Sequence, residues 1–305
     1  MGTMLIRPRP SPFQLFFILR GSIVPRIAPQ IIGYALFAAL IVALARHYGL
    51  QASGYGLAPF TVLGVALSIF LGFRNNAAYE RWWEARKLWG QLVFEIRNLA
   101  RAVQALVPQD SGQVRPLLME SLAFCHYLRG ALREVDADPE VRRFVGDAAD
   151  TFRTAVNKPD AVLRSMERRL AALKQAGRIE AMDFRLLDER ICGMAALQAG
   201  CERISSTPLP FTYALLLHRF AYWFCLLLPF GLVSVAGWAS PLFTALVVYS
   251  FFGLDALSEE LEDPFGTGNN DLALDTLCRV DEISVFEALG EPPPPPFAPD
   301  NYHYS

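Results

Sequence analysis

Three acidic residues near position 260 have a spacing that could act on ions. Asp255, Glu259 and Glu262 are four and three residues apart, so a helix would carry them on one face. Copied around a symmetry axis, they would form an acidic ring that draws cations toward a pore. Alternatively they pair with arginines at a membrane boundary, because an unpaired carboxylate near hydrocarbon is costly. We favour pairing, with candidate partners Arg74, Arg81 and Arg86.

Other residues that could carry chemistry do not form a recognisable pattern. The Gly266–Asp271 segment lacks the lysine of a phosphate-binding loop and the acidic ligands of an EF-hand, so it favours a helix-to-helix turn. The five cysteines and four histidines are scattered, without the spacing of a zinc site. No nucleophile, base and orienting residue stand at a familiar spacing. We therefore expect no enzyme activity, no cofactor and no metal site.

The composition indicates a protein with membrane and aqueous parts. The chain has 305 residues, of which 53% are hydrophobic and 19% charged, and its mean hydropathy is +0.26. That is too apolar for an average soluble protein and too charged for one lying wholly in a membrane. The net charge of −2 gives no reason to expect nucleic acid as a partner.

Four apolar stretches suggest membrane spans, and the shortest of them, the fourth, runs on into Asp255 and the acidic end of the same helix. They cover Ile27–Leu50, Gly54–Phe73, Leu215–Ala239 and Leu242–Leu254. Lys and Arg cluster before the first, after the second and before the third, so both termini and the central region are expected in the cytoplasm. No cleavable signal peptide is evident. The pattern predicts a multi-pass protein of the cell inner membrane.

The expected fold is all-α, with five segments along the chain. Residues 1–73 hold a short interfacial helix near residues 12–21 and the first two spans, and residues 74–207 form a cytosolic helical region. Charged residues in that region are expected mainly on solvated faces. Residues 208–262 hold the last two spans, and residues 263–290 a cytosolic helical segment. Residues 291–305 are proline-rich and are expected to be disordered.

The second span carries two rows of residues at helical spacing. A small row, suited to close packing of helices, consists of Gly64, Ser68 and Gly72. A bulky row about 100° round the helix consists of Val65, Ile69 and Phe73. On spacing alone the bulky row is more typical of ordinary membrane-helix packing than of a pore lining.

Four separated stretches, taken in order, resemble the bestrophin family of ion channels in its bacterial branch. They are Arg20–Ile23, Leu71–Phe73 followed by Arg81–Trp83, Thr207–Phe211 and Glu260–Gly266. The resemblance implies a homopentamer with four membrane helices per subunit, a cytosolic helical region and one ion pathway on the fivefold axis. It also implies that the second membrane helix lines a hydrophobic neck, which reverses the interpretation of the bulky row.

The resemblance assigns further roles to single residues. By the resemblance, the residues of the neck correspond to Val65, Ile69 and Phe73. A second constriction, on the cytosolic side, corresponds to a residue within Ile179–Phe184, for which we select Met182. Animal bestrophins place an acidic calcium clasp where this chain has Thr267–Asp271, so calcium gating is not expected.

The predicted function is passive conduction of monovalent ions through the neck, which gates by wetting and dewetting. The acidic residues after the fourth span and the net charge of −2 favour cations, Na⁺ or K⁺, over Cl⁻. The expected partners are further copies of the chain, the lipid bilayer and the ions. The alternative is a helical membrane scaffold or assembly protein that conducts nothing.

Overall fold

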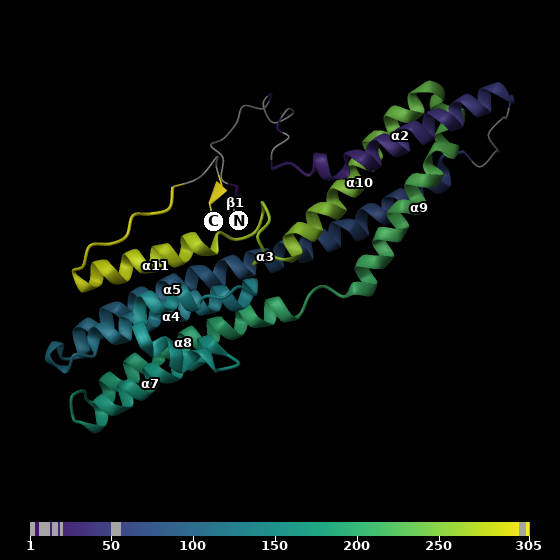
Figure 1. Cartoon of the computed structure of the whole chain (residues 1–305). Helices are drawn as coiled ribbons and strands as arrows, with labels where there is room; N and C mark the ends of the chain where they lie inside the picture. Colours follow the sequence, from purple (N-terminus) through teal and green to yellow (C-terminus); the bar gives the residue numbers. More distant parts are fainter. Residues whose placement is uncertain are drawn as a thin grey trace. The chain divides into compact units, whose positions relative to one another are not determined.

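The computed structural model describes residues 4–5, 13, 18, 21–49, 56–298 and 303–304. Within this part the chain forms two compact units, each built mainly of helices (Figure 1). Residues 7–82 and 208–263 form the apolar unit, and residues 1–6, 83–207 and 264–305 form the polar unit. Apart from Phe13, Ile18 and Gly21, the expected interfacial helix at residues 12–21 lies outside the described residues. The five-segment division of the chain stays a prediction.

The apolar unit contains the helices suited to a membrane. They are α2 (Val24–His47), the first part of α3, α9 (Phe211–Ala236) and α10 (Ser240–Glu262), with the 3₁₀ turn η3 (Gly237–Ala239) between the last two. The whole of α3 covers Ala58–Leu106, and its first part, residues 58–82, belongs to the apolar unit. Three stretches of the described residues are long and apolar enough to cross a membrane: Val24–His47, Ala58–Leu106 and Phe211–Glu262. The third stretch contains two helices, α9 and α10, because the turn η3 divides it.

Large apolar side chains hold the apolar unit together. α10 packs on α2 and α9, and α2 packs on α9. Leu67 and Leu71 bring α3 into the same buried cluster, where they join Phe224 of α9 and Phe251 of α10. The Phe224 and Phe251 rings meet edge to face, with centroids 5.4 Å apart.

The polar unit is a bundle around α4. Its elements are the second part of α3, η1 (Gln109–Ser111), α4 (Val114–Arg133), α5 (Asp138–Val145), η2 (Gly146–Ala148), α6 (Ala149–Arg153), α7 (Lys158–Gln175), α8 (Ala181–Ser206) and α11 (Leu274–Leu289). Every residue of α4 from Leu117 to Gly130 is buried, because α5, α7 and α11 all pack on this helix. The helix is capped by the following residue, Glu134, whose φ of 54° is left-handed.

Two charged residues of α4, Glu120 and Arg129, are buried, whereas most charged residues between 108 and 207 lie on exposed or half-exposed faces, as expected. Glu120 accepts hydrogen bonds from Ser165 (2.8 Å) and Arg169 (2.9 Å) on α7. Arg129 donates to Asp275 of α11 at 2.6 Å, and Arg133 donates to the same carboxylate at 2.7 Å. These charges enter the core because they have partners there.

A buried carboxyl cluster joins α4 to α11. His126 Nε2 lies 2.9 Å from Glu282 Oε1, and the Cys125 thiol donates to Asp281 Oδ2 at 3.4 Å. Asp281 is fully buried, and its Oδ1 has no hydrogen-bond partner within the described part of the chain. Burial raises the pKa of Asp281 from 3.8 to about 7. Near neutral pH this side chain therefore changes between a neutral acid and a carboxylate.

The described ends of the chain make a few contacts inside the polar unit. Two-residue strands β1 (Met4–Leu5) and β2 (His303–Tyr304) pair antiparallel. In the proline-rich tail, Glu291 forms an ion pair with Arg115 at 2.8 Å, and the Arg279 guanidinium lies over the Phe297 ring, 4.4 Å from its centroid. Disorder of residues 291–305 stays a prediction that proteolysis would test.

Candidate functional site

The first part of α3 has two opposite faces. Leu67 and Leu71 are completely buried in the apolar unit, whereas Val65, Ile69 and Phe73 are 56%, 51% and 64% exposed. Each bulky residue is two positions in sequence from Leu67 or Leu71. At about 100° per residue, its side chain therefore points roughly 160° away from that buried leucine. The bulky row is therefore turned outward from the core of its own unit and is available to line a pathway or to meet lipid.

The small row does not pack as one surface within the chain. A methyl group added at Gly64 would lie 3.2 Å from the Phe224 ring of α9, so Gly64 permits a close helix contact inside the unit. Ser68 donates its hydroxyl to the Gly64 carbonyl at 2.8 Å. A methyl group at Gly72 would meet nothing within 4 Å. Packing of Ser68 and Gly72 against another subunit stays a prediction.

Met182, the predicted second constriction, lies in the first turn of α8 in the polar unit. Its side chain is 62% exposed, whereas nearby Ile179 is buried. The helix begins with a reciprocal capping box between Glu180 and Asp183, which holds this first turn in place. The assignment of Met182 stays a prediction.

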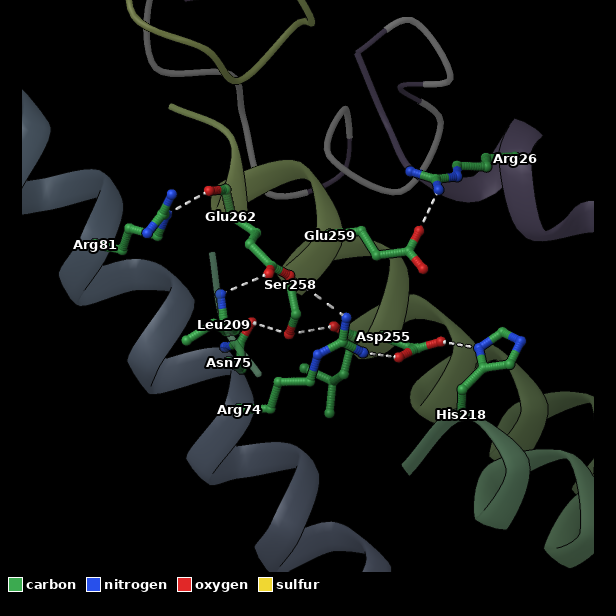
Figure 2. Close-up of polar contacts among 11 residues, drawn as sticks. Arg26, Arg74, Asn75, Arg81, Leu209, His218, Asp255, Ser258, Glu259 and Glu262 are labelled. Carbon is green, nitrogen blue, oxygen red and sulfur yellow. Dashed lines mark hydrogen bonds and ion pairs between the residues drawn. The ribbon is translucent and has the colours of Figure 1, made fainter. Parts of the chain in front are cut away.

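The acidic residues of α10 lie in a charged cluster of the apolar unit (Figure 2). Asp255 is the most buried of them: its Oδ1 accepts from Arg74 of α3, and its Oδ2 lies 2.8 Å from His218 Nδ1 of α9. Arg74 and Asp255 are each about 3% exposed. The expected pairing of these acids with arginines is confirmed for Asp255, and its partner is Arg74.

Glu262 makes contacts through both its side chain and its backbone. Arg81 donates to the Glu262 carbonyl oxygen at 2.6 Å, and the Leu209 amide donates to the Glu262 carboxylate at 3.0 Å. The other carboxylate oxygen is 3.8 Å from Arg74. Glu262 thus joins the end of α10 to α3 and to the proline-rich entry of α9.

Glu259 has a partner that was not predicted. It forms an ion pair with Arg26 in the first turn of α2, 233 residues away in sequence. Ser258 Oγ lies 3.4 Å from Asn75 Oδ1 of α3 (Figure 2). One face of α10 therefore bonds to α2, α3 and α9, and none of its three predicted acids is left without a polar partner.

The buried Arg74–Asp255 pair, together with the buried Leu67 and Leu71, holds α3 against its neighbours in the apolar unit. Taking either charge out of water carries a penalty of several kcal/mol, which the pair offsets only while both members remain. Arg74 directly follows Phe73, so the bond that holds Arg74 against α10 also keeps Phe73 turned outward. Arg74 is therefore a positioning residue for the bulky row.

Among the described residues, two groups of side chains have atoms close enough together to hold a metal ion. They are His218, Asp255 and Glu259 in the apolar unit, and Glu167, Asp188 and Cys192 in the polar unit. In the first group, Arg74 and Arg26 already balance the two carboxylates. Nothing in the geometry of the second group distinguishes it from ordinary acidic surface.

Comparison with known proteins decides the family. A model described as "Bacterial/Fungal Bestrophin protein" matches residues 4–287. The chain belongs to the bestrophin family. This bestrophin is 60% identical over 303 residues to a protein of Mesorhizobium japonicum named a voltage-dependent anion channel-forming protein, with 99% of this chain and 98% of that protein covered. An Escherichia coli K12 protein with the same description is 40% identical, with 99% of each covered.

A solved structure supports the same assignment. The crystal structure of a bacterial bestrophin homologue from Klebsiella pneumoniae matches with a TM-score of 0.82 at 33% identity, covering 89% of this chain and all of that one. The resemblance inferred from the motifs is thus confirmed, and this bestrophin is a helical membrane protein. The preference for cations is not supported, because the relatives are named for anions. The carboxylates behind that preference are also already bonded within the chain.

Proposed function

We propose that this bestrophin is a homopentameric channel that conducts monovalent ions passively across the cell inner membrane. Each subunit contributes four membrane helices, namely α2, the first part of α3, α9 and α10, with both termini and the polar unit in the cytoplasm. The observation that carries the proposal is the outward row Val65, Ile69 and Phe73, which is exposed on the face opposite the buried Leu67 and Leu71.

The row suits a hydrophobic neck. Around a fivefold axis, three successive rings of Val, Ile and Phe would form an apolar constriction that ions cross only while water fills it. Small changes in ring diameter would then open or close the pathway. In the same proposal, the exposed Met182 contributes a second constriction on the cytosolic side.

The sign of the conducted ion needs a separate argument, because apolar rings do not distinguish charges. The names of the relatives favour anions such as Cl⁻. Reversal potentials of purified protein in a KCl gradient measure this preference directly. A potential near that of K⁺ would show that the sequence-based expectation of cations was right.

The test of the neck is a triple variant, Val65→Ala with Ile69→Ala and Phe73→Ala. Removing the rings' bulk widens and wets the constriction, so ion flux into proteoliposomes should rise about tenfold or more, as expected for loss of a barrier of about 1.4 kcal/mol. The matched control truncates three exposed apolar residues of α2, by Ile32→Ala, Leu36→Ala and Leu40→Ala. Those side chains meet lipid in the proposal, so flux should stay as in the parent.

Two outcomes would contradict the proposal. Equal flux from the neck variant, the control and the parent would remove the neck from the pathway. A monomer in detergent together with no flux from any variant would favour a membrane scaffold instead.

A further inference from the structure

Glu80 is the exposed charged residue on the outward face of α3 in the apolar unit. Residues 58–82 of α3 contain three charged side chains, Arg74, Glu80 and Arg81. Arg74 is buried and Arg81 half-buried, whereas Glu80 is exposed. Because Glu80 follows Phe73 by seven residues, its direction differs from that of Phe73 by only about 20°.

Glu80 also differs from the other acidic residues considered above in having no partner. Asp255, Glu259 and Glu262 are each bonded to a residue of another segment of the apolar unit. Among the described residues, no hydrogen bond or ion pair involves Glu80. Within the part of the chain that the structure describes, no cationic side chain is therefore paired with the Glu80 carboxylate.

We propose that Glu80 is a charge-specificity residue of the channel, forming a ring of five carboxylates on the cytoplasmic side of the neck that favours cations and opposes anions. The inference rests on the proposed function, because it needs the bulky row to face the pathway. It requires no change in the neck, since the apolar rings hold no charge of their own. In this proposal Glu80, and not Asp255, Glu259 or Glu262, forms the acidic ring that draws cations toward the pore.

The expected influence is moderate and depends on salt. Glu80 lies about 10 Å along the helix from Phe73, at 1.5 Å per residue. The Debye length is also about 10 Å at 0.1 M salt and about 3 Å at 1 M, so the ring acts on ions at the neck only in dilute salt. Clefts lined by one sign of charge raise local counter-ion concentrations by roughly tenfold. Removing the ring should change the Cl⁻/K⁺ permeability ratio by roughly three- to tenfold.

The test uses the full-length channel in proteoliposomes or planar bilayers with a KCl gradient near 0.1 M. Glu80→Gln should raise the Cl⁻/K⁺ permeability ratio, Glu80→Lys should raise it further, and Glu80→Asp should restore the parent value. Both shifts, those of Glu80→Gln and Glu80→Lys, should vanish near 1 M KCl because the charge is then screened. The control is Glu259→Gln, which removes a carboxylate of the same unit that faces Arg26 of α2, and should leave the ratio unchanged.

A second readout places a removable charge at the same position. Cys192 is the one exposed cysteine of the five, so the background variant is Cys192→Ser. With Glu80→Cys added, a negatively charged thiol reagent should lower the Cl⁻/K⁺ ratio and a positively charged one should raise it. A reagent effect independent of charge sign would overturn the proposal.

Failure of the inference can be told apart from failure of the proposed function. If the neck variant raises flux while Glu80→Lys leaves the permeability ratio of a pentamer unchanged at 0.1 M, Glu80 does not set specificity and the channel stands. If neither the parent nor the neck variant conducts, the channel itself is refuted, and the inference with it.

Discussion

Both units bury carboxyl groups, and one from each unit, Asp255 and Asp281, shows a different way of tolerating burial. In the apolar unit Asp255 lies between the guanidinium of Arg74 and the ring of His218. In the polar unit Asp281 has only the weak thiol donor Cys125, and one of its oxygens has no partner among the described residues. The first is buried as a charge with its counter-charge. The second is tolerated because it accepts a proton near pH 7.

The difference between Asp255 and Asp281 reflects how the environment of each carboxyl group compensates its charge. A segment that crosses a membrane has no water nearby to solvate a charge, so a carboxylate there needs a permanent cation beside it. A helical bundle can exchange protons with solvent when it fluctuates open, so a buried carboxyl can adapt its charge instead. Asp255 therefore contributes a fixed contact, and Asp281 contributes a dependence on pH.

The largest expected effect comes from breaking the compensated pair. Arg74→Ala leaves Asp255 buried with His218 as its remaining side-chain partner, and should lower the free energy of unfolding by about 3–5 kcal/mol. Thermal unfolding in detergent checks this. The double variant Arg74→Ala with Asp255→Ala should lose less than the sum of the two single variants, because no charge is then stranded. Strict additivity would show that the pair is not coupled.

The next effect tests the proton-accepting carboxyl. Because the pKa of Asp281 is raised from 3.8 to about 7 in the folded state, the folded protein holds a proton that the unfolded chain releases between those values. Stability should thus be greatest below pH 4 and fall by about 1.4 kcal/mol per pH unit up to pH 7, from this group alone. Asp281→Asn should remove that slope, as measured by urea unfolding between pH 4.5 and 7.5. The fully exposed carboxylate of Asp147 offers a control, since Asp147→Asn should keep the slope.

The smallest effect separates buried from exposed pairs. Arg26 and Glu259 have side chains 51% and 40% exposed, so water and salt screen their attraction. Arg26→Ala should change stability by no more than about 1 kcal/mol, several times less than Arg74→Ala. The same thermal unfolding measurement in detergent checks it. A loss as large as that of Arg74→Ala would mean that exposure does not govern these pairs.

Part of this arrangement was predictable from local sequence. The apolar stretches and the absence of proline between Pro59 and Pro108 allow α3 to be one helix. The two faces of its first part follow from helical spacing. The pairing of Asp255 with Arg74 follows from the expense of a lone charge near hydrocarbon.

Other features depend on tertiary packing that no local pattern carries. From the sequence alone, several arginines are equally suitable partners for Glu259. Arg26 becomes its partner only because α2 packs on α10. The sequence of α4 looks like a solvated helix because Glu120, His126 and Arg129 interrupt its apolar residues. Their burial becomes understandable only once α7 and α11 supply their partners.

The adjacency of Phe73 and Arg74 has a genetic consequence. In the proposed homopentamer every neck ring needs one side chain from each subunit, so a single subunit with a loosened α3 leaves a gap in all three rings. When parent and Arg74→Ala chains are made together, most assemblies contain at least one altered copy. Such an allele is expected to be dominant over the parent allele.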